Sequence, residues 1–368
     1  MKIIYYFPEY ATPMFSWQRI HIFDELERHG IAIETFNPLL FSSAAEANEI
    51  FAKKLQSEQF DLLLSSVCYE GMIFPEVLSV AHNKGLPSLC IRWDNLTVPF
   101  FDERQAKEFD LLWLTAHETE YLYRKWGANY IIQPYAANPF AFKFFQKEIN
   151  RKVCFIGTPY GSRSLMLNKL TTNGVPVVAF YGGKRKGDSQ IAVSYGMVTP
   201  TQKKILIDRF RYKEGRRIML GMLANKLFKG ETVKTNEWLE HRSAIQPNEI
   251  SNYYSEYALS LASTSTNHTD SLKHPLPIVN LRNFEIPMSG GVEICKYNPE
   301  LAEYFEEGKE ILFYKSNDEL VDKARYYIRK AKDSEIFGLK QAARTRAKSD
   351  HTWWKRFTNA FDILGLKY

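Results

Sequence analysis

The chain of 368 residues is 45% hydrophobic, which is enough for two domains that each bury a core of their own. Its aromatic share of 14% argues against a disordered protein. The net charge of +6 is concentrated in residues 201–230, where nine Lys and Arg stand against two acids. No recognisable nucleic-acid-binding pattern accompanies that charge, so nucleic acid is not an expected partner.

The first third of the chain alternates apolar runs with amphipathic ones, and a glycine marks each return to an apolar run. Gly30, Gly85 and Gly127 each follow a helix-like stretch and precede a strand-like one. Glycine suits the left-handed residue that ends a helix, and continuous apolar runs suit strands covered on both faces. The pattern predicts βαβ units with a parallel sheet.

The N-terminal run MKIIYYFP is too short for a membrane span or a signal peptide, and we expect it to be a strand. The four cysteines are scattered, form no CxxC pair and mostly lie in apolar runs. We therefore expect reduced, buried thiols and a cytoplasmic protein.

The same alternation restarts at KVCFIG, residues 152–157, which predicts a second domain. We expect an α/β protein with two doubly wound, Rossmann-like domains that face a cleft. The predicted parts are residues 1–140, residues 141–349 with the basic segment 201–230, and a C-terminal helix in 350–368 that returns to the first domain. That helix carries Trp354, Phe357, Phe361 and Leu364 on one face, and we interpret it as a packed helix rather than a partner-binding one.

Three stretches resemble glycosyltransferases of the GT-B fold, in particular the spore-maturation-type branch of the group that contains family 4. They are GANYIIQPYAANPFAF at 127–142, VCFIGTPYGSR at 153–163, and VNLRNFEIPMSGGVE with the residues that follow it, 279–320. The resemblance covers most of the chain. It implies transfer of a sugar from a nucleotide diphosphate sugar to a glycan or lipid-linked glycan, without a metal or separate cofactor. The donor would bind the second domain and the acceptor the first.

Two glutamates, Glu285 and Glu293, stand eight positions apart around a Pro and a Gly pair. Asn280 as an N-cap and Gly290 as a stop predict a helix that carries Glu285, whereas Glu293 falls in the next strand, so they are not expected to be partners. The resemblance implies that Glu285 accepts the ribose hydroxyls of the donor. Arg282, one helical turn earlier, would hold the diphosphate, or would instead pair with a surface acid.

The family's first signature acid falls at Pro277 in this chain, and proline cannot take that part. The polar loop after the strand-like run YALSLA covers this region. It offers Asp270 or His268 as substitutes, and a plain solvated loop is the alternative.

The turn in CFIGTPYGSR ends a strand and opens a helix near Ser162. Free backbone N–H groups there, with Arg163 beside them, predict an anion site without a metal, and we assign Gly157 and Thr158 to it. Lys184, in the glycine-rich turn FYGGKRKGD, is a further candidate for the diphosphate, with an ordinary surface turn as the alternative. No Asp-x-Asp pair follows an apolar strand, so no metal ligands are predicted.

Asp94 and His117 each follow a strongly apolar strand-like run in the first domain, and we predict them as catalytic or donor-contacting residues. The alternatives are structural. Asp94 would form a turn before Asn95, and His117 would lie in the first turn of a helix capped by Thr115.

Residues 201–230 mix their cations with apolar side chains, which predicts a basic amphipathic helix or helical pair. Such a surface suits anionic lipid at the inner face of the membrane, and a packed helix with a solvated basic face is the alternative.

Two other functions stay open. One is a non-catalytic glycan-assembly or coat protein, which the missing acid at Pro277 favours, and the other is a sugar-nucleotide isomerase.

Overall fold

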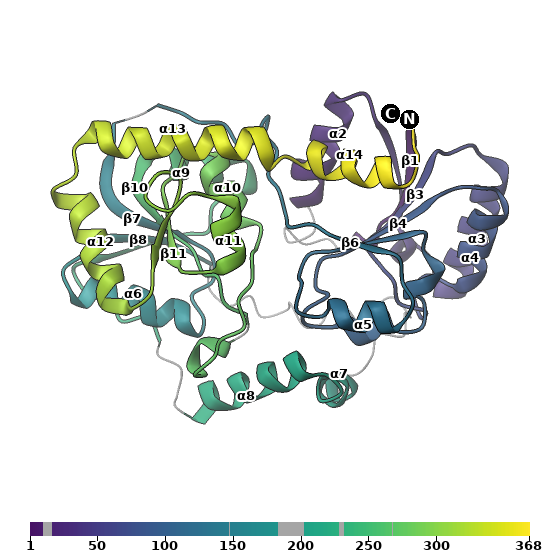
Figure 1. The fold of residues 1–368 in the computed structure, drawn as a ribbon, viewed down its shortest axis with the longest axis horizontal. Coiled ribbons are helices and arrows are strands. Elements are labelled where there is room, and N and C mark those ends of the chain that lie inside the picture. Colours follow the sequence, from purple (N-terminus) through teal and green to yellow (C-terminus); the bar gives the residue numbers. More distant parts are fainter. Residues whose placement is uncertain (10–16, 147, 183–201, 228–231, 267) are drawn as a thin grey trace. The chain divides into compact units, whose positions relative to one another are not determined.

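The structure is a computed structural model, and it describes residues 1–9, 17–146, 148–182, 202–227, 232–266 and 268–368. The chain divides into two compact units (Figure 1). Unit 1 contains Met1–Pro134, Lys186–Arg216 and Trp354–Tyr368, and unit 2 contains Tyr135–Arg185 and Arg217–Trp353. The basic segment, expected in the second domain, is therefore divided between the two units.

Unit 1 is built on a six-stranded parallel sheet with the order β2-β1-β3-β4-β5-β6. The strands are β1 Lys2–Tyr6, β2 Ala32–Phe36, β3 Leu62–Ser65, β4 Ser88–Arg92, β5 Leu111–Leu114 and β6 Tyr130–Ile132. The helices are α2 Asp24–Arg28, α3 Ala44–Ser57, α4 Pro75–Asn83, α5 Glu120–Lys125, α7 Gln202–Arg209 and α14 Trp353–Ile363, and the 3₁₀ segment η3 is Pro99–Phe101. α3 and α4 lie side by side against the sheet (Figure 1). The predicted βαβ architecture is confirmed.

The predicted helix stops of unit 1 are also confirmed. Gly30, Gly85 and Gly127 have φ of +82°, +64° and +71°, in the left-handed region that a residue with a Cβ rarely adopts. Each follows the end of a helix, α2, α4 or α5, and leads towards the next strand. The glycines therefore set the lengths of the helices in this half of the chain.

The C-terminal helix α14 packs in unit 1 with a face slightly different from the predicted one. Trp353, Phe357 and Phe361 are fully buried, whereas Trp354 and Leu364 are partly exposed. The ring of Phe357 lies 5.3 Å from that of Trp113 on β5. The packed role that we predicted for this helix is confirmed.

Unit 2 contains the second six-stranded parallel sheet, with the order β12-β11-β10-β7-β8-β9. The strands are β7 Asn150–Ile156, β8 Val177–Phe180, β9 Leu239–Arg242, β10 Tyr257–Leu261, β11 Glu293–Lys296 and β12 Leu312–Tyr314. The helices are α6 Ser162–Thr172, α9 Ile250–Glu256, α10 Arg282–Met288, α11 Pro299–Tyr304, α12 Asn317–Arg329 and α13 Asp333–Asp350. Helix α8, Lys213–Leu227, starts in unit 1 and continues into unit 2.

The sheet of unit 2 reverses its strand order between β7 and β10, which are neighbours although 100 residues of chain lie between the end of β7 and the start of β10. At such a reversal the loops leaving the two strands diverge to opposite faces of the sheet, and ligands of doubly wound proteins bind in the resulting crevice. The loops after β7 and β10 are thus where the fold itself predicts a ligand.

The four cysteines are buried and free, as predicted. Of the helices that the structure describes, none is both long and apolar enough to cross a bilayer.

Candidate functional site

The helix that carries Glu285 forms where the sequence predicts it. Oδ1 of Asn280 accepts the N–H of Arg282, the first residue of α10, at 3.1 Å, although the N-cap position itself is Leu281; Gly290, with φ of +69°, follows the end of the helix. The side chain of Glu285 is 8% exposed and that of Arg282 34% exposed. Nη1 of Arg282 lies 3.9 Å from Oε2 of Glu285, so the two groups share one face of the helix.

The guanidinium of Arg282 is held over the end of β7. Gly157 has φ of +140°, and a Cβ at this position would lie 3.2 Å from Nη2 of Arg282, so glycine is needed for the close approach. Nη1 of Arg282 also donates to the hydroxyl of Tyr254 on α9, at 3.4 Å. Desolvation by itself lowers the pKa of Arg282, but Tyr254 and Glu285 outweigh it and the net pKa is raised. The cation is thereby fixed at the reversal point of the sheet.

A second cation, Arg163 at the start of α6, faces the same place. Its guanidinium carbon lies 4.5 Å from the centre of the Tyr160 ring, and Nη1 donates to the carbonyl of Thr158 at 3.3 Å. Burial lowers the pKa of Arg163, and the positive charge of Arg282 lowers it further. Two guanidinium groups that repel each other are a favourable setting for an anion with at least two charged oxygens.

The backbone of this turn contributes less than predicted. The N–H of Gly157 donates to Phe180 O at 3.0 Å, and the N–H groups of Tyr160 and Arg163 donate to carbonyls within the turn. The predicted set of free N–H groups is wrong for these three residues. Gly157 provides space rather than a donor, and the positive charge at the site comes from the two arginines.

His268 lies against the same turn. A Cβ at Gly161 would be 2.5 Å from Nδ1 of His268, and the His268 ring lies 5.7 Å from that of Tyr160. His268 has φ of +62°, a left-handed conformation that is uncommon for a residue with a side chain. Desolvation lowers the pKa of the His268 imidazole, against the charge of Asp270, and so favours its neutral form.

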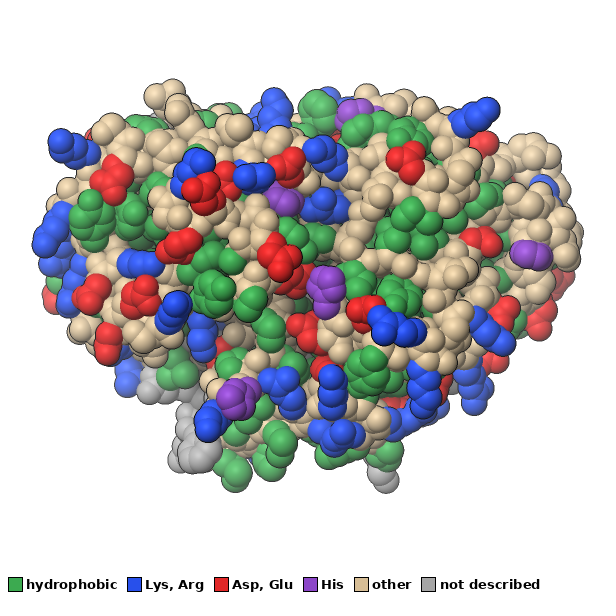
Figure 2. Space-filling model, viewed as in Figure 1, with side chains coloured by type: hydrophobic (Ala, Val, Ile, Leu, Met, Phe, Trp, Pro, Cys, Tyr) green, Lys and Arg blue, Asp and Glu red, His purple; other side chains and the backbone are tan. Residues whose placement is uncertain are grey.

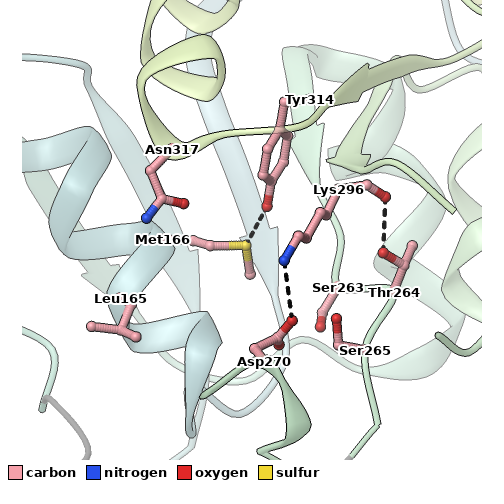
Figure 3. Close-up of a pocket in the computed structure, with 9 residues that line it drawn as sticks. All are labelled: Leu165, Met166, Ser263, Thr264, Ser265, Asp270, Lys296, Tyr314 and Asn317. Atoms are coloured by element: carbon pink, nitrogen blue, oxygen red, sulfur yellow. Dashed lines mark hydrogen bonds and ion pairs between the residues drawn. The ribbon is translucent and has the colours of Figure 1, made fainter. Parts of the chain in front are cut away.

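Asp270 lines a cavity of about 120 Å³ beside this turn (Figure 3). Its Oδ1 lies 3.9 Å from Nζ of Lys296 on β11, and the hydroxyl of Thr264 donates to Lys296 O at 2.9 Å. The cavity extends from α6, where it meets Met166, to Asn317 at the start of α12. Its lining offers both donors and acceptors, which suits the hydroxyls of a sugar or the edge of a nucleobase.

Helix α8 supports the loop that carries His268 and Asp270. A Cβ at Gly221 would lie 3.1 Å from the carbonyl oxygen of His268, so the helix approaches the loop backbone closely. Nη2 of Arg217 donates to Pro275 O at 3.2 Å and also bonds to His274 O. Part of the basic segment is therefore structural. No local signal in the sequence indicated these contacts.

Glu293 takes no part in this group. It opens β11, is 1% exposed and accepts a hydrogen bond from Asn283 Nδ2 at 2.5 Å. Desolvation raises the pKa of its carboxyl to about 7, while Asn283 and Cys295 oppose the shift. The prediction that Glu285 and Glu293 lie on different elements is confirmed.

Asp94 and His117 lie in unit 1, in the loops after the adjacent strands β4 and β5, and both are exposed. Buried Asn95 joins these loops, because its Nδ2 donates to Ala116 O at 2.8 Å and its Oδ1 accepts the N–H of Thr115. The carbonyl of Asp94 accepts two N–H groups in a turn, as the structural alternative proposes. For His117 that alternative is wrong, since α5 begins only at Glu120 and the Thr115 hydroxyl bonds back to the β4 loop.

Lys184 lies outside the described residues, so its predicted role has no structural counterpart. Tyr254, Tyr160 and Lys296 complete the site without having been predicted. Tyr160 belongs to the predicted turn itself, whereas Tyr254 and Lys296 reach the site from elements distant in the sequence.

The sequence was compared with models of protein families and with curated protein sequences. A sequence model of the glycosyl transferase-like family matches residues 211–362. No curated protein sequence matches the chain.

Solved structures of glycosyltransferases are similar over nearly the whole chain. HepE of Anabaena, in complex with UDP and glucose, has a TM-score of 0.58 at 12% identity, covering 99% of both chains. An alpha-glucosyltransferase in complex with UDP and a 13-mer DNA has a TM-score of 0.60 at 12% identity, covering 99% of this chain and 98% of that one. Sucrose-phosphate synthase of Thermosynechococcus elongatus has a TM-score of 0.56 at 10% identity with the same coverage.

The fold is therefore the GT-B fold of glycosyltransferases, two parallel six-stranded sheets with flanking helices. The C-terminal part of the chain carries a glycosyl transferase-like sequence, and it includes α10 and its two candidate site residues.

Proposed function

We propose that this protein is a glycosyltransferase that moves a sugar from a nucleotide diphosphate sugar to a glycan or lipid-linked glycan. The observation that carries the proposal is the meeting of Arg282, Arg163 and Gly157 at the reversal point of the unit 2 sheet, with Glu285 one helical turn away. Two cations and a carboxylate are the charged groups that suit the diphosphate and the ribose of a nucleoside diphosphate. The UDP and UDP-glucose bound by HepE support a uridine nucleotide as the donor.

Glu285 accepts the two ribose hydroxyls, since an ionised carboxylate presents two oxygens to them. Arg282 and Arg163 hold the diphosphate beside Gly157 and Thr158, and Lys184 is assigned to the same group. The arginines compensate the charge that grows on the leaving diphosphate, so the transfer needs no metal ion. Pro277 stands where the family has an acid that faces the sugar. His268 and Asp270 take over that role.

Asp94 and His117 of unit 1 are the proposed catalytic or donor-contacting residues. An inverting transfer needs a group that takes the acceptor's proton, and a carboxylate or an imidazole meets that need. Their loops are tied together by Asn95, which supports a shared role.

The spore-maturation-type branch and a cytoplasmic location are further parts of the proposal, the latter supported by four free thiols. We also propose that α7 and α8 contact anionic lipid, which would bring the enzyme to a lipid-linked acceptor at the inner face of the membrane.

The donor site is tested by replacing Glu285 with Gln and measuring UDP affinity by titration calorimetry. Losing one charged acceptor of two ribose hydrogen bonds should weaken binding by roughly 10- to 100-fold. Glu303→Gln on α11, an exposed glutamate of the same unit, is the matched control and should bind UDP as the native protein does. Equal UDP affinity of Glu285→Gln and the native protein would remove Glu285 from the site.

A non-catalytic protein of glycan assembly is the second candidate, because Pro277 occupies the position of a family acid and pairs in a β-bridge with Ser265. Incubation with a panel of nucleotide sugars separates the candidates. A transferase releases nucleotide and modifies an added glycan, an isomerase converts the sugar, and a non-catalytic protein does neither.

A further inference from the structure

Unit 1 contains a larger cavity, of about 570 Å³, that none of the donor-site residues line. Two walls follow strands of the sheet: Tyr69 and its neighbours after β3, and η3 with the turn behind it after β4. The third wall comes from α7 and Arg211 just beyond it. The volume is within the range of small-molecule sites.

The walls after β3 and β4 supply aromatic rings. The ring centres of Tyr69 and Phe101 are 5.3 Å apart, and those of Phe100 and Phe101 are 4.8 Å apart. A Cβ at Gly71 would lie 2.7 Å from the Tyr69 ring, so glycine lets this ring turn back over its own loop. Three rings in contact form a continuous apolar surface in the cavity.

The charged groups of the cavity balance each other. Three acids, Glu70, Glu103 and Asp208, stand with three cations, Arg104, Lys204 and Arg211. Nη1 of Arg104 lies 3.0 Å from Glu70 Oε2, and Nη2 of Arg211 lies 2.5 Å from Glu103 Oε2. The cavity thus has no net charge but many hydrogen-bonding groups.

The α7 wall is firmly attached to unit 1. The hydroxyl of buried Tyr212, just after α7, donates to Thr97 O at 2.9 Å and to Leu96 O at 3.3 Å. A Cβ at Gly215 would collide with the carbonyl of Arg209 and the Tyr212 ring, so the turn from α7 to α8 depends on glycine. This segment lies in the sequence between β8 and β9, two strands of unit 2, but it completes a cavity of unit 1.

We propose that this cavity binds the glycan acceptor of the proposed transfer, as an uncharged sugar ring. One face of a sugar ring consists of C–H groups and packs on aromatic rings, while its hydroxyls both donate and accept. The hydroxyls therefore match paired carboxylates and guanidinium groups. An anionic ligand would gain no net attraction, because the three acids balance the three cations, and a wholly apolar ligand would desolvate the ion pairs without replacing their hydrogen bonds to water. The inference rests on the proposed function, and it makes α7 a determinant of acceptor choice.

The test is saturation-transfer NMR of the full-length protein with cellobiose, chitobiose and digalacturonic acid, together with UDP titration. The native protein should bind one of the two uncharged disaccharides. Tyr69→Ala and Glu70→Gln should each weaken that binding at least about tenfold and leave UDP affinity unchanged. Thermal unfolding of both variants shows whether either substitution disturbs the fold. If Tyr69→Ala does not fold, Glu70→Gln still tests the proposal.

Tyr326→Ala, an exposed tyrosine on α12 of unit 2, is the matched control and should bind sugar normally. Sugar binding that survives both cavity variants, or binding of the acidic disaccharide alone, would overturn the acceptor cavity. UDP binding without any sugar binding refutes the cavity only. Sugar binding without UDP binding refutes the proposed donor site and leaves the cavity standing.

Discussion

At the residue scale, the surroundings of Glu285 and Glu293 decide what each carboxyl does. Glu285 is buried and has the guanidinium of Arg282 3.9 Å away on the same helix face, a setting that suits an acceptor of hydrogen bonds. Glu293 is buried beside the Asn283 amide and the Cys295 thiol, and desolvation is the largest cause of its raised pKa. Desolvation therefore favours its neutral form.

This difference gives a pH-dependent stability. The pKa of Glu293 is raised from 4.5 to about 7, so the folded protein binds that proton more tightly than the unfolded chain. The contribution of protonated Glu293 to the free energy of unfolding is complete below pH 4.5 and is lost as the pH rises through about 7. Glu293→Gln, always neutral, should be more stable than the native protein by up to about 3 kcal/mol at about pH 8 and nearly equal to it at about pH 5.

Urea unfolding of unit 2 at the two pH values measures the effect. Glu303→Gln, exposed on α11, is the control and should show no such pH dependence. A Glu293→Gln variant that is equally destabilised at both pH values would contradict a neutral Glu293 in the fold.

At the element scale, α7 and α8 expose apolar side chains that a packed helix would bury. Leu220, Leu223 and Leu227 are 56%, 53% and 69% exposed, and their spacing puts them on one side of α8. Figure 2 shows basic and hydrophobic side chains mixed at the surface over these helices, along the lower edge of the view. Tyr212 and Ile218 are buried, so part of the segment is packed as the structural alternative predicts, and contact with lipid stays a prediction.

This surface predicts binding to anionic vesicles. Burying two leucines contributes several kcal/mol, so Leu220→Gln with Leu223→Gln should reduce flotation with phosphatidylcholine–phosphatidylglycerol vesicles more than about tenfold. Leu40→Gln, 79% exposed in unit 1, is the control. Binding that resists the double substitution, or that ignores salt and phosphatidylglycerol, would show that α8 is not a lipid surface.

At the scale of the whole molecule, the chain builds two cores and returns to the first at its end. Phe357 on α14 is fully buried against Trp113, so Phe357→Ala should destabilise unit 1 by about 3–5 kcal/mol. UDP should stabilise unit 2 by mass action and leave unit 1 unchanged. Calorimetry with and without UDP should therefore show one transition lowered by the substitution and another raised by the ligand.

Ile363→Ala, 52% exposed on the same helix, is the control and should change stability by less than about 0.5 kcal/mol. A single transition that both the substitution and UDP shift would mean that the units unfold together.

Local signals made much of this protein predictable. The glycine stops, the parallel strands and the helix between Asn280 and Gly290 follow from residues next to each other in the chain, because backbone conformation is largely a local property. The resemblance then indicated Arg282, Glu285 and the turn at Gly157 as parts of one site.

The sequence by itself determined the two α/β halves and the helix that presents Glu285. Only the tertiary structure decided that Arg282 lies over Gly157 and bonds to Tyr254, that His268 covers Gly161, and that α7 walls a cavity of unit 1. These neighbours are far apart along the chain, and their meeting depends on strand order and side-chain packing, which no local pattern encodes.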